Sequence, residues 1–166
     1  MNSYLERLRQ ELEQATAGAD ATRLAQSLAG KWSAVQILEH LLHTYKGTNA
    51  GLKHCLEQGS PSASRTTMKD RFATLLVVGL GYLPEGRKAP DRTMPRGMTP
   101  DEIRPAVASE LKRLAAQMDV CELKFGSRTK LLDHPFIGPL TADQWRKFHW
   151  VHGRHHIRQM QDRMKS

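Results

Sequence analysis

The sequence contains few cysteines and no pairing motif for them. Cys55 and Cys121 are the two cysteines, and they lack the C-x-x-C spacing of thiol redox motifs. Isolated cysteines of this kind are more typical of buried structural thiols than of nucleophiles. So low a cysteine content also fits the cytoplasm, where thiols stay reduced.

Long apolar stretches are also missing. The longest candidate spans residues 72–83 and includes two glycines, whereas a transmembrane helix needs about 18–20 apolar residues. The first residues of the chain lack the apolar core of a signal peptide. We therefore expect a cytoplasmic protein that does not bind a membrane.

Runs of like charge are absent as well, although the chain is basic. It has 25 Lys and Arg against 17 Asp and Glu, a formal charge of +8 with histidine neutral. This balance favours acidic ligands, but there is no block of five or more basic residues and no nucleic-acid-binding motif. We interpret the charge as a generally basic surface and expect no nucleic-acid partner.

What the sequence does contain is the pattern of a helical domain. Its 166 residues, 39% hydrophobic and 25% charged, suit one globular domain over residues 1–166. Leu5, Leu8 and Leu12 mark one face of a helix over residues 3–16. Capping boxes mark three further helix starts, at Ser33 with Gln36, Thr99 with Glu102, and Thr141 with Gln144. The first two of these helices should run to about residues 57 and 118.

Shorter elements are expected between these helices. Residues 21–30 favour a short helical turn and residues 68–78 a helix, whereas the prolines and glycines of residues 83–97 indicate a loop. A long connection is expected over residues 119–140, and no segment shows a convincing strand pattern. The prediction is an all-α fold, most simply a four-helix bundle with an additional short helix.

Half of the eight histidines lie within residues 149–156, in the last predicted helix. His152 and His156 are four residues apart, so on a helix both imidazoles can reach one metal ion. His149 faces roughly the same way, and His155 points to the flank. One helix therefore offers two good ligands but not a closed coordination shell, and further ligands must come from another helix.

His40 is the best candidate for that third ligand, because it lies in mid-helix beside an apolar stripe. His43 is the substitute. Three neutral imidazoles suit Zn, Ni, Fe or Cu, and they leave open positions for water or substrate. Glu39 is next to His40 in sequence but points about 100° away on a helix, so we expect it at the surface or behind the ligand and not as a catalytic base.

The histidines lie in two blocks that together resemble a known family. Residues 32–41 (WSAVQILEHL) and 152–159 (HGRHHIRQ) are similar to the two blocks of the DinB/YfiT-like superfamily of metal-binding four-helix bundles. Residues 134–141 (HPFIGPLT) resemble a subgroup of uncharacterised bacterial members. The resemblance covers about residues 30–160, and it implies His40, His152 and His156 as the metal ligands.

The resemblance also implies a choice of functions, because its members include thiol-dependent transferases and isomerases as well as metal-binding proteins. The first hypothesis is an enzyme that uses a divalent metal (Zn, Ni or Fe) to activate a low-molecular-weight thiol, or water, towards a small-molecule substrate. A metal-dependent hydrolase is the variant, although Gly153 stands where the zincin motif has its Glu. The alternative is a non-catalytic metal-binding or stress-response protein.

Two further features stay open at the level of sequence. The basic loop at residues 87–96, or Arg154 and Arg158, could hold the carboxylates of an acidic thiol or substrate, but a plain exposed loop and a solvated helix face explain them too. The N-terminal helix and Trp150 indicate either a homodimer contact or packing within one chain.

Overall fold

Helices make up most of the molecule. The computed structural model describes residues 3–84 and 88–165. Four long helices run through it: α1 (Ser3–Thr16), α3 (Ala34–Gln58), α5 (Pro100–Phe125) and α6 (Ala142–Met164). Two short ones, α2 (Ala21–Ala25) and α4 (Met68–Thr74), lie between them, with a π-helical turn at Leu75–Gly79 and a 3-10 turn at Asp91–Thr93. Within the described residues, no helix combines the length and apolarity that crossing a membrane requires.

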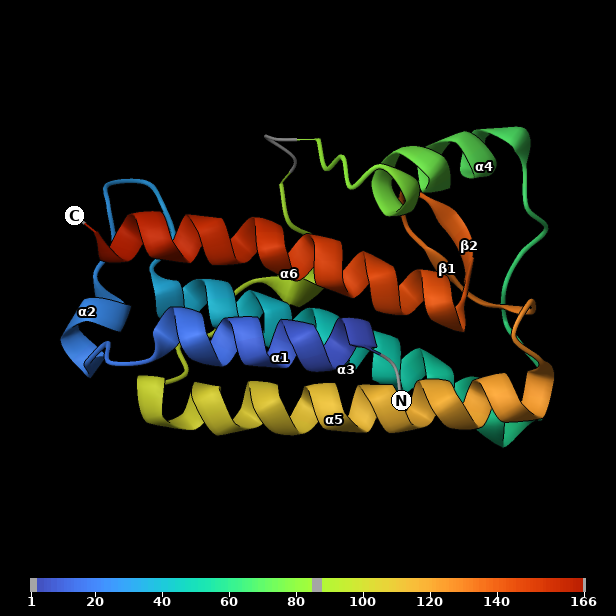
Figure 1. The fold of residues 1–166 in the computed structure, drawn as a ribbon, viewed down its shortest axis with the longest axis horizontal. Helices are drawn as coiled ribbons and strands as arrows, with labels where there is room; N and C mark the ends of the chain where they lie inside the picture. The colour runs from blue at the N-terminus through green and yellow to red at the C-terminus, as the bar shows by residue number, and fades with distance from the viewer. Residues whose placement is uncertain (1–2, 85–87, 166) are drawn as a thin grey trace.

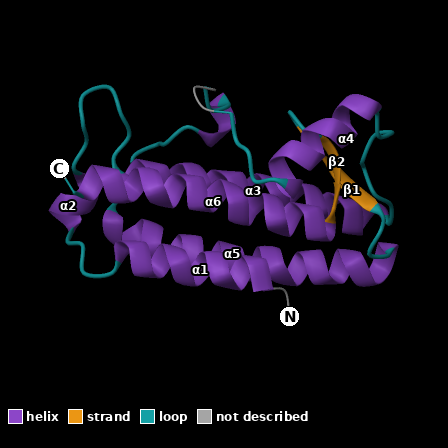
Figure 2. Ribbon diagram, turned by 45° about the horizontal axis from the view of Figure 1, so that its top comes forward, coloured by secondary structure: helices purple, strands orange, loops and turns teal. Residues whose placement is uncertain are grey.

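The four long helices lie side by side and enclose the core (Figures 1 and 2). The most extensive contacts join α3 to α5 and α1 to α6. Leucines and other apolar side chains from all four helices are buried between them, among them Leu8, Leu41, Leu114 and Met160. The helix starts marked by Ser33, Thr99 and Thr141 are confirmed, since the paired Gln or Glu accepts the cap residue's backbone N–H in each.

The expectation of an entirely helical chain is wrong at residues 130–141. A two-stranded antiparallel sheet forms there, with β1 (Lys130–His134) paired to β2 (Gly138–Thr141). Three leucines of these strands are buried, namely Leu131, Leu132 and Leu140. Each strand is too short to give a readable alternation, and its burial comes from packing against α3, α4 and α6. The hairpin sits over one end of the long helices (Figure 2).

The helix α5 is also longer than its sequence indicated. It runs past Met118 to Phe125, because Cys121 continues its buried stripe towards α3. Gly126, at a φ of 95°, then ends the helix in a backbone conformation that other residues rarely adopt.

The contact between α1 and α6 depends on a glycine. Leu8 of α1 is fully buried against Gly153, and a Cβ placed on Gly153 would overlap the Cδ atoms of Leu8. Nearby, the ring of Trp150 lies under the guanidinium groups of Arg7 and Arg154, each 4.9 Å from the ring centroid. Trp150 therefore makes contacts within the chain although it is only half-buried, and a homodimer contact stays a prediction.

We predict that Gly153→Ala lowers the free energy of unfolding. Overpacking costs about 1–3 kcal/mol, which exceeds the gain of somewhat under 1 kcal/mol from placing Ala in a helix. Gly47→Ala in α3 is the matched control, since its Cβ would meet nothing within 4 Å, and it should stabilise the protein. Urea denaturation measures both. Equal stabilisation by the two substitutions would contradict the close approach of α1 to α6.

Candidate metal centre

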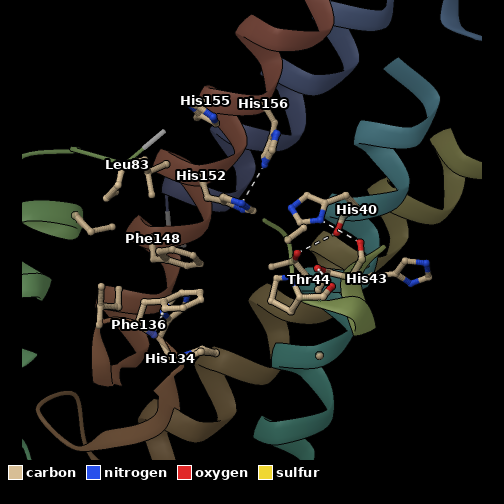
Figure 3. A pocket seen from close by; sticks show the side chains of 18 of the residues that line it. His40, His43, Thr44, Leu83, His134, Phe136, Phe148, His152, His155 and His156 are labelled. Atoms are coloured by element: carbon tan, nitrogen blue, oxygen red, sulfur yellow. Dashed lines mark hydrogen bonds between the residues drawn. The ribbon is translucent and has the colours of Figure 1, made fainter. Parts of the chain in front are cut away.

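The three histidines predicted as ligands lie together in the structure. His40 comes from α3, and His152 and His156 come from successive turns of α6. One ring nitrogen from each can be chosen so that all three lie within 4.8 Å of one another. The His40 ring centroid is 5.4 Å from that of His152 and 4.9 Å from that of His156. Figure 3 shows the three rings converging from the two helices.

Hydrogen bonds fix which nitrogen of two of these rings is free to bind a metal. Nδ1 of His40 lies 3.1 Å from the backbone carbonyl of Thr93. Nδ1 of His156 lies 2.8 Å from the side-chain oxygen of Gln159. Both oxygens only accept, so both Nδ1 atoms donate and each Nε2 carries a lone pair. Such bonds to the second nitrogen are the usual way that proteins orient a histidine ligand.

His152 completes the group at a spacing that suits a shared ion. Its Nε2 lies 3.1 Å from Nε2 of His156. Two nitrogens bound to one ion at the usual 2.0–2.1 Å are about 2.8–3.4 Å apart for octahedral or tetrahedral angles. Nδ1 of His152 is buried and has no hydrogen-bond partner in the described part of the chain. The three imidazoles are therefore donors of the kind that transition metals prefer, and His152 and His156 already have the spacing of two ligands on one ion.

Burial keeps these imidazoles neutral, as metal ligands must be. Loss of hydration lowers the pKa of His40, although its bond to Thr93 acts in the opposite direction. Burial, followed by repulsion from the neighbouring histidines, holds the pKa of His152 well below its ordinary value. The same causes lower the pKa of His156 to about 3. Near neutral pH all three rings offer lone pairs without first losing a proton.

Glu39 is buried, which rules out the surface position that the sequence had left open for it. Its carboxylate accepts the backbone N–H groups of Arg96, Gly97 and Met98, at 2.7, 3.0 and 3.1 Å. Burial acts to raise the pKa of Glu39, but these three bonds outweigh it and leave the pKa below its ordinary value. Glu39 does point away from His40 on the helix, as its sequence position predicted. The sequence did not predict that a loop would cover this face of α3.

Glu39 and His40 therefore hold one loop from adjacent positions. The carboxylate binds the loop at residues 96–98, and the imidazole binds it at Thr93. His43 lies outside the group of three, with Nε2 3.4 Å from the Glu39 carboxylate. The loop that Glu39 holds therefore also orients the ring of His40, one of the predicted ligands.

His149 and His155 have other roles. His149 is fully buried, and its Nε2 lies 3.1 Å from the hydroxyl of Thr48. It packs between Tyr45 and Trp145 in the core. His155 lies beside the group of three, and its Nε2 is 3.1 Å from the amide nitrogen of Gln159. Gln159 thus bridges His155 and His156.

The three histidines face a wide cleft between α3, α6, the hairpin and the loops. The ring of Trp32 lines it, as do those of Phe136 and Phe148, which Figure 3 shows. Of the basic residues considered for binding carboxylates, Lys88, Arg92 and Arg158 line the cleft. Arg154 instead packs on Trp150, and Arg87 lies outside the described residues.

His134 is a cleft residue that the sequence pattern did not mark as part of a site. It ends β1 and lines the cleft, with its ring centroid 4.4 Å from that of Phe148. Burial, followed by the charge of Arg92, lowers the pKa of His134 to about 4. In the sequence, only its position at the start of the HPFIGPLT block could have drawn attention to His134. The hairpin that brings it to the cleft was not predicted.

Comparison with known proteins gives one match. A family model described as "Protein of unknown function (DUF1569)" matches residues 5–163. The chain belongs to this family. No curated protein and no solved structure matches it. The family match spans both histidine blocks and the hairpin, but its description assigns no activity.

We predict that His149→Leu reduces acid sensitivity. Burial lowers the pKa of His149 from 6.5 to about 3, so between these values the unfolded chain binds a proton that the folded chain does not. Its contribution to stability is therefore present above pH 6.5 and lost as the pH falls, by about 1.4 kcal/mol per unit. Leu has a similar volume, and Thr48 keeps its bond to the Thr44 carbonyl.

The measurement is urea denaturation of metal-free wild type and variant from pH 7.5 to 4.5. The variant should lose less free energy of unfolding across this range, while the other histidines contribute equally to both proteins. Identical pH slopes would contradict a neutral, buried His149.

Proposed function

We propose that this chain binds a divalent transition metal (Zn, Ni or Fe) through His40, His152 and His156. The observation that carries the proposal is the convergence of three neutral imidazoles from two helices, with His40 and His156 buried and His152 half-buried. Hydrogen bonds to Thr93 and Gln159 leave Nε2 of two of them free for a metal. Three protein ligands leave coordination positions open, which is typical of catalytic rather than structural metal sites.

We also propose that the chain has the DinB/YfiT-like fold. Four long helices that pack along one another, with inward-facing histidines on two of them, are consistent with a four-helix bundle of the DinB/YfiT-like type. The family match over residues 5–163 supports a common architecture across nearly the whole chain. The hairpin and the short helices are then additions at one end of that bundle.

We further propose that the protein is a metal-dependent enzyme acting on a small molecule, with a low-molecular-weight thiol as the nucleophile. A bound metal would supply Lewis acidity and lower the pKa of a coordinated thiol or water. The cleft gives a substrate access to the three histidines, and its aromatic rings offer apolar contact beside them. The reaction class is therefore transfer to or from a thiol, as in the thiol-dependent transferases.

The position of Glu39 favours a thiol over water as the nucleophile. A hydrolase needs a general base beside the metal-bound water, whereas a metal-bound thiol loses its proton without one. Glu39, the carboxylate next to His40 in sequence, is occupied by three backbone N–H groups. The engagement of Glu39 with the loop is also consistent with a non-catalytic metal-binding protein, which remains the alternative.

Substitution of single histidines tests the site. We predict that His40→Ala or His156→Ala removes most of the bound metal, whereas His43→Ala retains it because His43 contacts Glu39 instead of the group of three. Elemental analysis of purified, untagged protein after incubation with Zn²⁺ measures the metal content per chain. Loss of metal from His43→Ala together with retention in His40→Ala would overturn the assignment.

A further inference from the structure

His134 presents a hydrogen-bond donor to the cleft. Its Nδ1 lies 3.2 Å from the backbone nitrogen of Phe136, which can only donate, so Nδ1 is the acceptor. A neutral imidazole then carries its proton on Nε2. Burial and the nearby charge of Arg92 lower the pKa of His134 to about 4, which keeps the ring neutral near pH 7. The hairpin thus fixes the tautomer of a half-buried histidine in the cleft wall.

Arg92 adds a positive charge beside this donor. It follows Asp91 in the 3-10 turn whose last residue, Thr93, accepts the His40 hydrogen bond. Both Arg92 and His134 line the cleft. Asp133, next to His134 in sequence, also lines the cleft, but its carboxylate accepts the backbone N–H of Ser64 at 3.0 Å. This end of the cleft therefore carries a cation and a neutral donor that an anion can share.

Phe148 separates this pair from the three histidines. Its ring packs on His134, with 4.4 Å between centroids, and stacks on His152, with 5.5 Å between centroids and 11° between planes. Figure 3 shows the order His134, Phe148 and His152 along the cleft wall. A ligand that reaches from His134 to the group of three must pass an aromatic surface about one ring wide.

We propose that Arg92 and His134 form a binding subsite for the carboxylate of an organic substrate or thiol whose apolar part packs against Phe148. The guanidinium supplies charge, the imidazole Nε2–H supplies a directed hydrogen bond, and the ring supplies apolar contact. The subsite orients the ligand so that its other end faces His152. This inference rests on the proposed function only for the chemistry at the end of the ligand that faces His152.

The test uses benzoate as the probe, benzamide as its uncharged counterpart, and inorganic phosphate as an anion without an apolar part. Binding to the full-length, metal-free protein is followed by NMR, using the His134 ring nitrogens and protein amides. The variants are Arg92→Gln and His134→Phe. Arg96→Gln is the matched control, since Arg96 is an exposed arginine of the same loop that does not line the cleft.

The proposal predicts that His134 has its proton on Nε2 at pH 7.5 and that benzoate binds more tightly than benzamide or phosphate. Arg92→Gln should weaken benzoate about fivefold, as expected for an exposed ion pair, and His134→Phe about tenfold. Arg96→Gln should change nothing. A proton on Nδ1, equal binding of benzoate and benzamide, or equal effects of Arg92→Gln and Arg96→Gln would each overturn it.

A parallel zinc titration separates this inference from the proposed function. Zinc bound at one per chain without the benzoate preference would overturn the subsite alone. Benzoate binding that depends on Arg92 and His134, in a protein that binds no zinc, would overturn the metal site and leave the subsite standing.

Discussion

The site depends on enclosing three neutral imidazoles between α3 and α6, two of them buried and His152 half-buried. A buried polar group is costly unless it has a partner, and the surroundings provide partners one ring at a time. Thr93 binds His40, Gln159 binds His156, and the two facing Nε2 atoms of His152 and His156 are 3.1 Å apart. Much of the local architecture serves these contacts. Glu39 holds the loop that carries Thr93, and Gly153 lets α1 pack against the histidine-bearing helix.

The sequence predicted the parts of this arrangement that depend on local spacing. The i, i+4 relation of His152 and His156 and the apolar stripe beside His40 place these rings on inward faces, and the capping boxes locate the helices that carry them. It did not predict parts that depend on tertiary packing. The burial of Glu39 requires a loop more than 50 residues away in sequence, and the hairpin that positions His134 has strands of only four or five residues. Neither contact leaves a periodic signal.

Histidines of one helix have different roles because their partners differ. His149 is more deeply buried than the proposed ligands, and its bond to Thr48 and its packing on Trp145 place it in the core. His152, one turn further on, faces the cleft beside His40. The cleft then has two chemically distinct ends, with lone pairs at the three histidines and hydrogen-bond donors at Arg92 and His134. Phe148 lies between them, so a ligand with an anionic end and a reactive end suits this geometry.

X-ray absorption at the zinc edge of the reconstituted protein reports whether His40, His152 and His156 bind one metal ion. We expect one zinc per chain with three imidazole nitrogens at about 2.0–2.1 Å and one or more exchangeable oxygen ligands completing the shell. A shell with sulfur at about 2.3 Å, or one with fewer than two imidazoles, would contradict it. The same spectrum from His40→Ala, with one imidazole fewer or no bound zinc, would assign the ligand on α3.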